Sequence, residues 1–234
     1  MKVLIIIPAY NEQDNIGDLI EKIKGNNYEH IVDILVINDK SIDNTALIAR
    51  NHGATVIDLP CNLGIGGAVQ TGYKYAALHN YDVAIQVDGD GQHNPEYIDL
   101  LVTPIASGAA DMVVGSRYIQ FEGFQSSKLR RIGILYLKNL INMLSGLKIT
   151  DPTSGYRACS KEIISLFAIN YPSDYPEPES IMYVKRKGFN VMEIPVIMNE
   201  RKAGISSINF HRSIYYMIKV SLAILFDRVR KESW

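Results

Sequence analysis

The first half of the chain alternates short apolar runs with amphipathic segments, and this order constrains the fold more than any other feature. Residues 3–7 are consecutively apolar, which is typical of a strand buried on both faces of a parallel sheet. Residues 15–24 follow with apolar side chains at helical spacing. The same order continues with strands expected at 34–37, 55–59, 83–87 and 111–115, and helices at 44–52, 67–78 and 95–107. The alternation predicts an α/β fold with a mostly parallel, doubly wound sheet flanked by helices.

The second half is less regular. The pattern predicts, in order, a long helix at 129–147, a turn-rich loop at 151–157, a proline-rich loop at 171–178, a helix at 179–187, a strand at 191–198, a basic loop at 201–207 and a last helix at 213–229. We therefore expect one domain at 1–210 and an apolar helix within 211–234. That helix packs on the domain, on a second copy of the chain, or at a membrane surface.

Composition narrows the class of protein. The 234 residues are 47% hydrophobic and 21% charged, as in a globular protein, and the net charge of −1 gives no global attraction to nucleic acid. Cys61 and Cys159 have neither zinc-finger spacing nor a disulfide framework, which favours a reducing compartment. No run reaches the roughly 20 apolar residues of a membrane span. We expect a cytoplasmic protein, with the inner face of the cytoplasmic membrane as the alternative location.

Polar clusters follow the predicted strands, where parallel sheets bind their ligands. Asp88-Gly89-Asp90 comes directly after the fourth strand. Its two carboxylates suit Mg²⁺ or Mn²⁺, and such an ion can hold a diphosphate. Taken alone, the segment also fits a surface turn rich in Asp and Gly.

Three earlier loops lie at the same edge of the predicted sheet. Residues 8–12 follow the first strand, and Asp39 follows the second, where its carboxylate can accept from a base or a ribose hydroxyl. Residues 62–67 form a glycine-rich turn without the Lys-Ser/Thr of a Walker A site and without a third glycine at position 69. Each loop alone is equally consistent with an ordinary turn or helix cap.

The second half adds cations and acids. Arg117 follows the fifth predicted strand, and Arg131 lies near the start of the long predicted helix. Arginine can bind phosphate oxygens through two parallel hydrogen bonds. Glu177 and Glu179 are candidates for a general base, or they stabilise the first turn of a helix. Residues 151–157 form either part of a site or a capped turn.

Taken together, the motifs PAYNE, NDxSxDxT, NxGxG, DGDGQHxPE, GSRY and DPTSGYR occur in one order between residues 8 and 157. This set resembles the family 2 glycosyltransferases with the GT-A fold. It is most similar to the branch with dolichyl- or polyprenyl-phosphate mannose and glucose synthases and bacterial cell-surface polysaccharide transferases. The resemblance extends from residue 3 to about residue 207.

The resemblance implies a role for each matching residue. The nucleotide sugar is bound by Pro8, Ala9, Tyr10, Glu12, Asp39, Asn62, Gly66, Asp88, Gly89, Asp90 and Arg201. The ligands of Mg²⁺ or Mn²⁺ are Asp88, Asp90 and Gln92. The acceptor or its phosphate is bound by Arg117, Arg131, Asp151 and Ser154. The catalytic set is Asp88, Asp90, Glu177, Glu179 and Arg117. Two departures stand out, because many relatives carry Asp at position 38 and Gly at position 40, where this chain has Asn38 and Lys40.

The implied activity is a metal-dependent, inverting transfer of a sugar from a GDP-, UDP- or dTDP-linked donor to a lipid-linked or cell-surface glycan. If the acceptor is instead a polyprenyl phosphate, it is already an anion and no base is needed. A nucleotidyltransferase is disfavoured, since residues 8–12 replace the GxGTR-like loop of that class. A non-catalytic sugar-nucleotide-binding module and a homo-oligomer stay open as alternatives.

Overall fold

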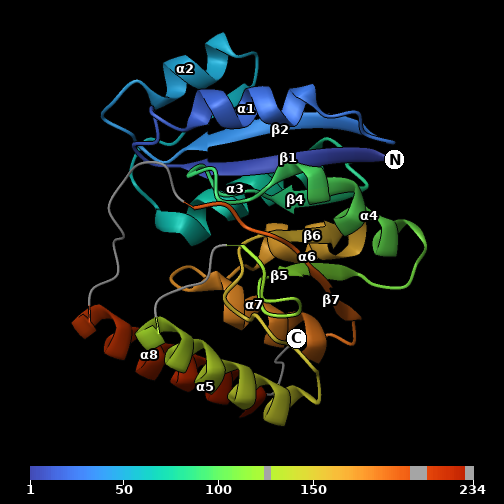
Figure 1. The fold of residues 1–234 in the computed structure, drawn as a ribbon, viewed down its shortest axis with the longest axis vertical. Helices are drawn as coiled ribbons and strands as arrows, with labels where there is room; N and C mark the ends of the chain where they lie inside the picture. The colour runs from blue at the N-terminus through green and yellow to red at the C-terminus, as the bar shows by residue number, and fades with distance from the viewer. Residues whose placement is uncertain (124–127, 201–209, 230–234) are drawn as a thin grey trace.

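The computed structural model describes the backbone of residues 1–123, 128–200 and 210–229, and the side chains of 1–123, 131–200 and 217–226 (Figure 1). The predicted residue Arg201 and the expected basic loop at 201–207 lie outside this part of the chain. In the described helices, none combines the length and the apolarity needed to cross a bilayer.

A seven-stranded sheet organises the described chain, in the order β3-β2-β1-β4-β6-β5-β7. The strands are β1 (Lys2–Ala9), β2 (Ile31–Asn38), β3 (Thr55–Asp58), β4 (Val83–Gln86), β5 (Met112–Ser116), β6 (Arg157–Ser160) and β7 (Val191–Pro195). β6 runs antiparallel to both of its neighbours, and all other pairs are parallel. The sheet confirms the predicted mostly parallel α/β fold.

Helices cover both faces of the sheet. They are α1 (Ile16–Gly25), α2 (Thr45–Asn51), α3 (Gly64–Leu78), α4 (Ile98–Ala106), which follows a short 3₁₀ turn η1 (Pro95–Tyr97), α5 (Lys128–Ser145), α6 (Lys161–Ile169), α7 (Pro176–Arg186) and α8 (Phe210–Val229). Side chains of β1 alternate between two cores, since Ile5 packs with α1 and α4, whereas Ile6 packs with α3, α6 and α7. The strand ends are thereby fixed from both sides.

Four expectations for the second half need correction. Residues 151–157 are not loop throughout, because Arg157 begins β6, and α6 follows where no helix was expected. β6 has only four residues and a charged first position, so it lacks the apolar run that identifies a strand. Helix α7 begins at Pro176, not at residue 179, because proline is well accommodated in the first turn of a helix. β7 ends at Pro195, before the expected residue 198.

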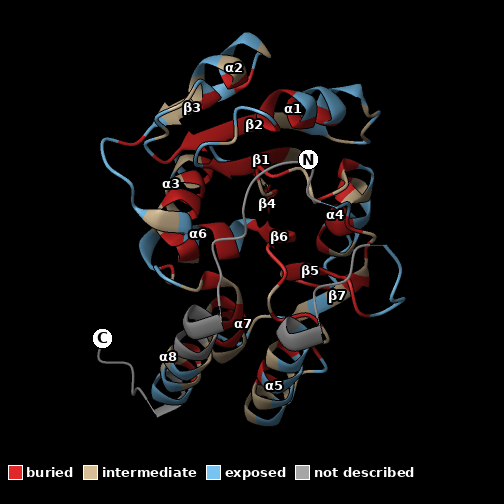
Figure 2. Ribbon diagram, turned by 60° about the vertical axis from the view of Figure 1, so that its left-hand side comes forward, coloured by how far each residue is buried: buried red, intermediate tan, exposed pale blue. Residues whose placement is uncertain are grey.

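α5 and α8 pack together at the end of the molecule opposite α1 and α2 (Figure 1). The Tyr136 hydroxyl lies 3.1 Å from the Ser221 hydroxyl between the two helices. Leu137 of α5 and Val220 of α8 are buried against α7 and its neighbours. Exposed residues line the outer sides of both helices (Figure 2).

Candidate active site

The loops after β1, β2 and β4 meet with the start of α3 at one edge of the sheet. The Asp39 N–H donates to the Ala9 carbonyl at 2.9 Å, and the Asn62 side chain donates to the Asp39 carbonyl at 3.2 Å. A Cβ built on Gly89 would lie 3.2 Å from the Pro8 carbonyl oxygen. The structure therefore brings together the four loops for which the resemblance predicts contacts with a nucleotide.

Three more residues of this group flank the same edge. Tyr10 is 50% exposed after β1, so its ring is accessible to a ligand. The Glu12 carboxylate accepts from the Asn15 side chain at 2.8 Å. Gly66 lies in the first turn of α3, where a Cβ would come within 2.2 Å of the Ser173 carbonyl oxygen. Close packing of this helix against a loop explains the glycine.

Asp39 is tied to the start of α3. Its Oδ1 accepts from the Leu63 N–H at 2.7 Å and its Oδ2 accepts from the Gly64 N–H at 2.9 Å. The residue is buried. These bonds satisfy two donors at the start of a helix, and each oxygen keeps a second lone pair for a ligand.

The two departures from the family pattern have structural counterparts. The Asn38 side chain donates to Asp58 Oδ1 at 2.7 Å, and this hydrogen bond is the main cause that lowers the pKa of Asp58. An aspartate at position 38 would face that carboxylate as a like charge. Lys40 adopts φ of 63°, in the left-handed region that favours glycine. The lysine therefore retains a backbone conformation suited to the residue that relatives carry.

The segment 88–93, hereafter the metal loop, carries the three predicted metal ligands. Asp88 Oδ1 accepts from Gln86 Nε2 at 3.0 Å, yet 37% of the Asp88 side chain is exposed. Asp90 is buried, and its Oδ1 accepts from the Gln92 N–H at 3.1 Å. The Gln92 side chain donates to the Asn199 carbonyl at 3.4 Å. Of the two carboxylates, Asp88 therefore offers the more accessible oxygens.

The ligands of the metal loop fit an ion that is also bound by a substrate, and not an ion that protein ligands enclose on all sides. Over the residues with described side chains, no three His, Cys, Asp or Glu gather closely enough to enclose a metal. Mg²⁺ commonly uses one or two carboxylates and takes its other ligands from water and substrate phosphates. Asp88 and Asp90 match that pattern. A cavity of about 200 Å³ adjoins the loop beside α1 and is lined in part by Asp90 and His93.

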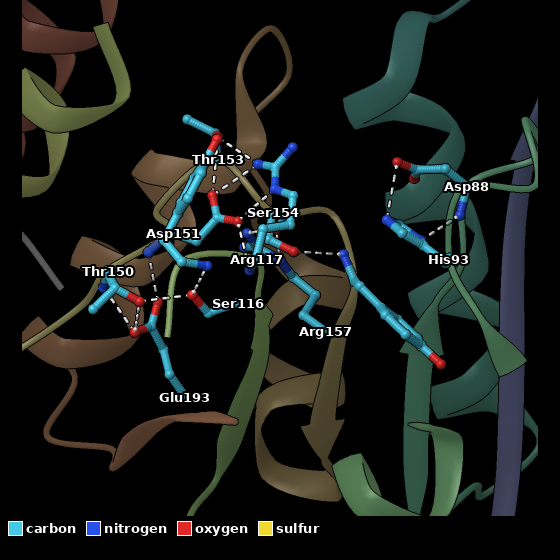
Figure 3. Close-up of polar contacts among 12 residues, drawn as sticks. Asp88, His93, Ser116, Arg117, Thr150, Asp151, Thr153, Ser154, Arg157 and Glu193 are labelled. Carbon is cyan, nitrogen blue, oxygen red and sulfur yellow. Dashed lines mark hydrogen bonds and ion pairs between the residues drawn. The ribbon is translucent and has the colours of Figure 1, made fainter. Parts of the chain in front are cut away.

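Arg117 forms a buried, bidentate pair with Asp151 (Figure 3). Its Nε donates to Asp151 Oδ2 at 2.6 Å and its Nη2 donates to Oδ1 at 2.8 Å. Nη2 also donates to Thr153 Oγ1 at 3.0 Å. Burial lowers the pKa of Arg117, but the hydrogen bond and charge of Asp151 outweigh it and leave this pKa raised. The charge of Asp88 acts in the same direction, so the pair lies within electrostatic reach of the metal loop.

Glu193 of β7 holds the turn that carries Asp151. Its carboxylate accepts from the Thr150 N–H and hydroxyl, both at 2.7 Å, and from the Asp151 N–H at 2.8 Å. Burial is the largest influence and raises the pKa of Glu193, while the backbone hydrogen bond from Asp151 lowers it. Three strands therefore position one arginine, since Arg117 follows β5, Asp151 precedes β6 and Glu193 lies in β7.

Arg157 connects the predicted Ser154 to the helix that carries the two candidate bases. Its guanidinium is fully buried and donates to the Ser154 carbonyl, to the Glu177 carbonyl at 3.1 Å and to Ser180 Oγ at 2.7 Å. Glu177 and Glu179 lie in the first turn of α7, where their negative charges interact favourably with the helix dipole. Arg131 lies apart, on α5, with its guanidinium 6.0 Å from the Phe121 ring centre.

Sequence reasoning assigned no role to several residues that shape this site. Gln86 is a polar residue inside an apolar strand, and that contrast is a usable signal. His93 follows the Asp-x-Asp pair within the same motif, and its ring contacts Asp88. Arg157 was part of a recognised motif, but its buried position is not visible in the sequence. Nothing in the local pattern marks Glu193.

Comparisons with known proteins identify a matching family model and several relatives. The chain matches the model described as "Glycosyl transferase family 2" over residues 4–167. A UDP-N-acetylglucosamine–dolichyl-phosphate N-acetylglucosaminyltransferase of Methanococcus voltae is 30% identical over 214 residues, which cover 83% of this chain and 84% of the relative. A polyprenol monophosphomannose synthase of Mycolicibacterium smegmatis is 28% identical over 245 residues, which cover 98% of this chain and 90% of the relative.

A solved structure shares the fold at low sequence identity. Glucosyl-3-phosphoglycerate synthase from Mycobacterium tuberculosis, in complex with Mn²⁺, uridine diphosphate and phosphoglyceric acid, superposes with a TM-score of 0.73 at 18% identity. The match covers 99% of this chain and 80% of that chain. It confirms the predicted fold class.

Proposed function

The chain belongs to glycosyl transferase family 2, and from this premise we propose that it transfers a sugar, with inversion, from a nucleoside-diphosphate sugar to a polyprenyl phosphate. The relatives named for dolichyl-phosphate and polyprenol substrates support this acceptor class. The sequence alone leaves two acceptors open, a lipid-linked or cell-surface glycan and a polyprenyl phosphate. A glycan acceptor is the second candidate, because its hydroxyl would need a general base and Glu177 and Glu179 are available for this role. Both lie at the start of α7, where the Glu177 carbonyl accepts from Arg157.

The observation that carries the proposal is a cation next to an exposed apolar surface. Arg131 is exposed near the start of α5, and Ile132, the next residue, is 67% exposed. The exposed large hydrophobic residues of α5 and α8 are Ile132, Leu135, Tyr136, Met143, Ile218, Leu222, Leu225 and Phe226. A polyprenyl phosphate combines one anionic group with a long apolar chain. This surface, hereafter the α5–α8 face, offers both kinds of contact and suits a lipid surface.

The residues at the other side of the site suit the donor. The loops around Ala9, Asp39 and Asn62 would hold the nucleoside, and Asp88 and Asp90 would hold the divalent ion. When bound, Mg²⁺ or Mn²⁺ would neutralise the charge that grows on the departing diphosphate. The Gln86 side chain donates a hydrogen bond to the Asp88 carboxylate, so the carboxylate oxygens are oriented before the nucleotide sugar binds.

A phosphate acceptor also changes what the acids of α7 must do. An anionic phosphate oxygen attacks without losing a proton, so no general base is required. Glu177 then serves α7 through its backbone carbonyl, which accepts from Arg157 and from Ser180. Arg131 is the proposed cation for the acceptor phosphate, and Arg117, which is already paired with Asp151, would contribute by fixing the turn that carries Asp151.

The decisive experiment supplies GDP-, UDP- and dTDP-sugars with Mn²⁺ and measures nucleoside diphosphate release. A short polyprenyl phosphate in detergent is compared with the matching polyprenol, which lacks the phosphate, and with a glycan primer. We expect release with the polyprenyl phosphate alone. Release only with the glycan primer would replace the proposal by chain building with Glu177 or Glu179 as base. No release with any acceptor would favour a sugar-nucleotide-binding module.

The metal assignment has its own test in the variant Asp88→Ala. Loss of the more accessible carboxylate should reduce turnover by more than about 100-fold, the upper range for loss of a residue that only supports a metal ligand. The variant should also lose its dependence on Mn²⁺ concentration. Unchanged turnover with unchanged metal dependence would show that Asp88 is not a ligand.

A further inference from the structure

We propose that His93 is a positioning residue for the metal loop, and that its two ring nitrogens, more than its packing, set the affinity for the divalent ion. The inference rests on the proposed function only in assuming that the loop holds a metal. His93 is not among the predicted ligands. Its role follows from the way its ring closes the loop that carries Asp88, Asp90 and Gln92.

The backbone N–H of Asp88 donates to His93 Nδ1 at 3.0 Å (Figure 3). A ring nitrogen that accepts a hydrogen bond carries no proton, so in this arrangement the proton of the neutral ring is on Nε2. This bond joins the first residue of the metal loop to its last. All three predicted ligands lie on the segment that it closes.

The second ring nitrogen faces the carboxylate of the first ligand. His93 Nε2 lies 3.7 Å from Asp88 Oδ2, which is longer than a hydrogen bond but close enough for an electrostatic attraction. Gln86 Nε2 donates to the other oxygen, Oδ1, at 3.0 Å. Asp88 is therefore oriented by one group on each oxygen while its side chain stays 37% exposed.

The ring itself is held in place by Tyr156, the residue that precedes β6. His93 is 3% exposed and stacks on Tyr156, with ring centres 4.6 Å apart and planes inclined by 8°. The Tyr156 hydroxyl donates to the Asn94 carbonyl at 2.8 Å, directly after the loop. His93 thus has two separable contributions, a packing contact with Tyr156 and two polar contacts with Asp88.

Two variants separate these contributions. His93→Phe keeps an aromatic ring for the stack but removes both nitrogens. His93→Asn gives up the stack but places an amide oxygen near the position of Nδ1, so it can still accept from the Asp88 N–H. His79→Phe is the matched control, because His79 also lies against a tyrosine, with its ring centre 4.1 Å from that of Tyr75, and is exposed outside the site.

The measurement is binding of Mn²⁺, alone and with UDP or GDP, followed by the electron paramagnetic resonance signal of free Mn²⁺. We expect affinity to fall in the order wild type, His93→Asn, His93→Phe, with a loss of about 10- to 100-fold in the phenylalanine variant. Thermal unfolding without metal checks that each variant is folded. His79→Phe should bind as the wild type does.

The outcomes distinguish this inference from the proposed function. If packing were the main contribution, His93→Phe would bind Mn²⁺ like the wild type and His93→Asn would bind most weakly, which would overturn the inference. If the wild type took up no Mn²⁺ with either nucleotide, the metal loop itself would be wrongly assigned. The acceptor experiment is independent of both results, because Mn²⁺ binding is measured without an acceptor.

Discussion

The proposed active site has two sides, the metal loop and the Arg117–Asp151 pair, and the carboxylates of these two sides have opposite roles. In the metal loop, Asp88 is fixed by Gln86 and His93 but remains 37% exposed. In the Arg117–Asp151 pair, Asp151 is completely buried, and both of its oxygens accept from the arginine. One carboxylate stays available for a ligand, and the other has its charge balanced inside the protein.

This difference shows that a charged residue in a family motif can have either of two functions. A partly exposed, oriented carboxylate keeps the ability to bind an ion, because its open oxygens are not compensated by the protein. A buried pair mainly fixes geometry, and removal of one partner leaves an uncompensated charge in a low-dielectric interior. We therefore expect substitutions on the Arg117 side to affect stability most, and substitutions beside Asp88 to affect metal binding most.

The largest effect is expected for Asp151→Asn. The amide would direct a donor at the guanidinium of Arg117, and a buried arginine would lose its counter-charge. We expect the free energy of unfolding to fall by about 3–5 kcal/mol, measured by urea denaturation.

Asp174→Asn is the matched control for that loss. Asp174 pairs with Lys219, and the two side chains are 54% and 39% exposed. Loss of such a surface pair should cost about 1 kcal/mol or less. Equal losses in the two variants would contradict the contrast between a buried structural pair and solvated charges.

The sequence predicts the first half of the fold well because its strands are apolar runs followed by polar turns. β6 escapes prediction because its four residues include Arg157 and Ser160. The reason for their burial is tertiary, since β6 is inserted between β4 and β5. A pattern of local periodicity contains no information on such an insertion.

The candidate site shows the same limit. The order of the motifs predicts that the loops after the first strands lie beside one another, because strand ends in a parallel sheet share an edge, and the structure has them in contact. The partner of Arg117 lies 34 positions further along the chain, and its contacts are fixed by the sheet. The sequence therefore indicates an arginine at the site without showing that Asp151 already binds it.

A smaller effect, on the metal side, is expected for Gly155→Ala. A Cβ at this position would lie 2.9 Å from Asp88 Oδ2 and 3.0 Å from Gln86 Nε2. The carboxylate would have to shift away from the position that Gln86 and His93 define. We expect Mn²⁺ to bind about 10-fold more weakly, with little change in the free energy of unfolding.

Gly25→Ala is the control for this substitution. Gly25 ends α1, and a Cβ there would meet no atom within 4 Å. It should leave Mn²⁺ binding unchanged. If Gly155→Ala lowered stability as much as Asp151→Asn does, while Mn²⁺ affinity stayed the same, the two sides of the site would not differ in the way proposed.

The smallest effect is a pH dependence that comes from Glu193. Burial raises the pKa of this carboxyl in the folded protein, so the folded state holds its proton more tightly than the unfolded chain does. The stability that Glu193 contributes is therefore fully present below its unfolded pKa, and it is lost as the pH rises through the higher folded value. Glu193→Gln removes this titration and leaves the other carboxyls in place.

We expect the difference in the free energy of unfolding, wild type minus Glu193→Gln, to favour the wild type more near pH 4.5 than near pH 7, since an unfolded glutamate titrates at about 4.3. Urea denaturation of both proteins across this range measures the difference, and subtraction cancels titrations that the two proteins share. A difference that grows toward pH 7 would mean that the hydrogen bonds from Thr150 and Asp151 outweigh burial. Glu193 would then stabilise the turn as a carboxylate, and the Arg117 side would depend on a second charged group in addition to Asp151.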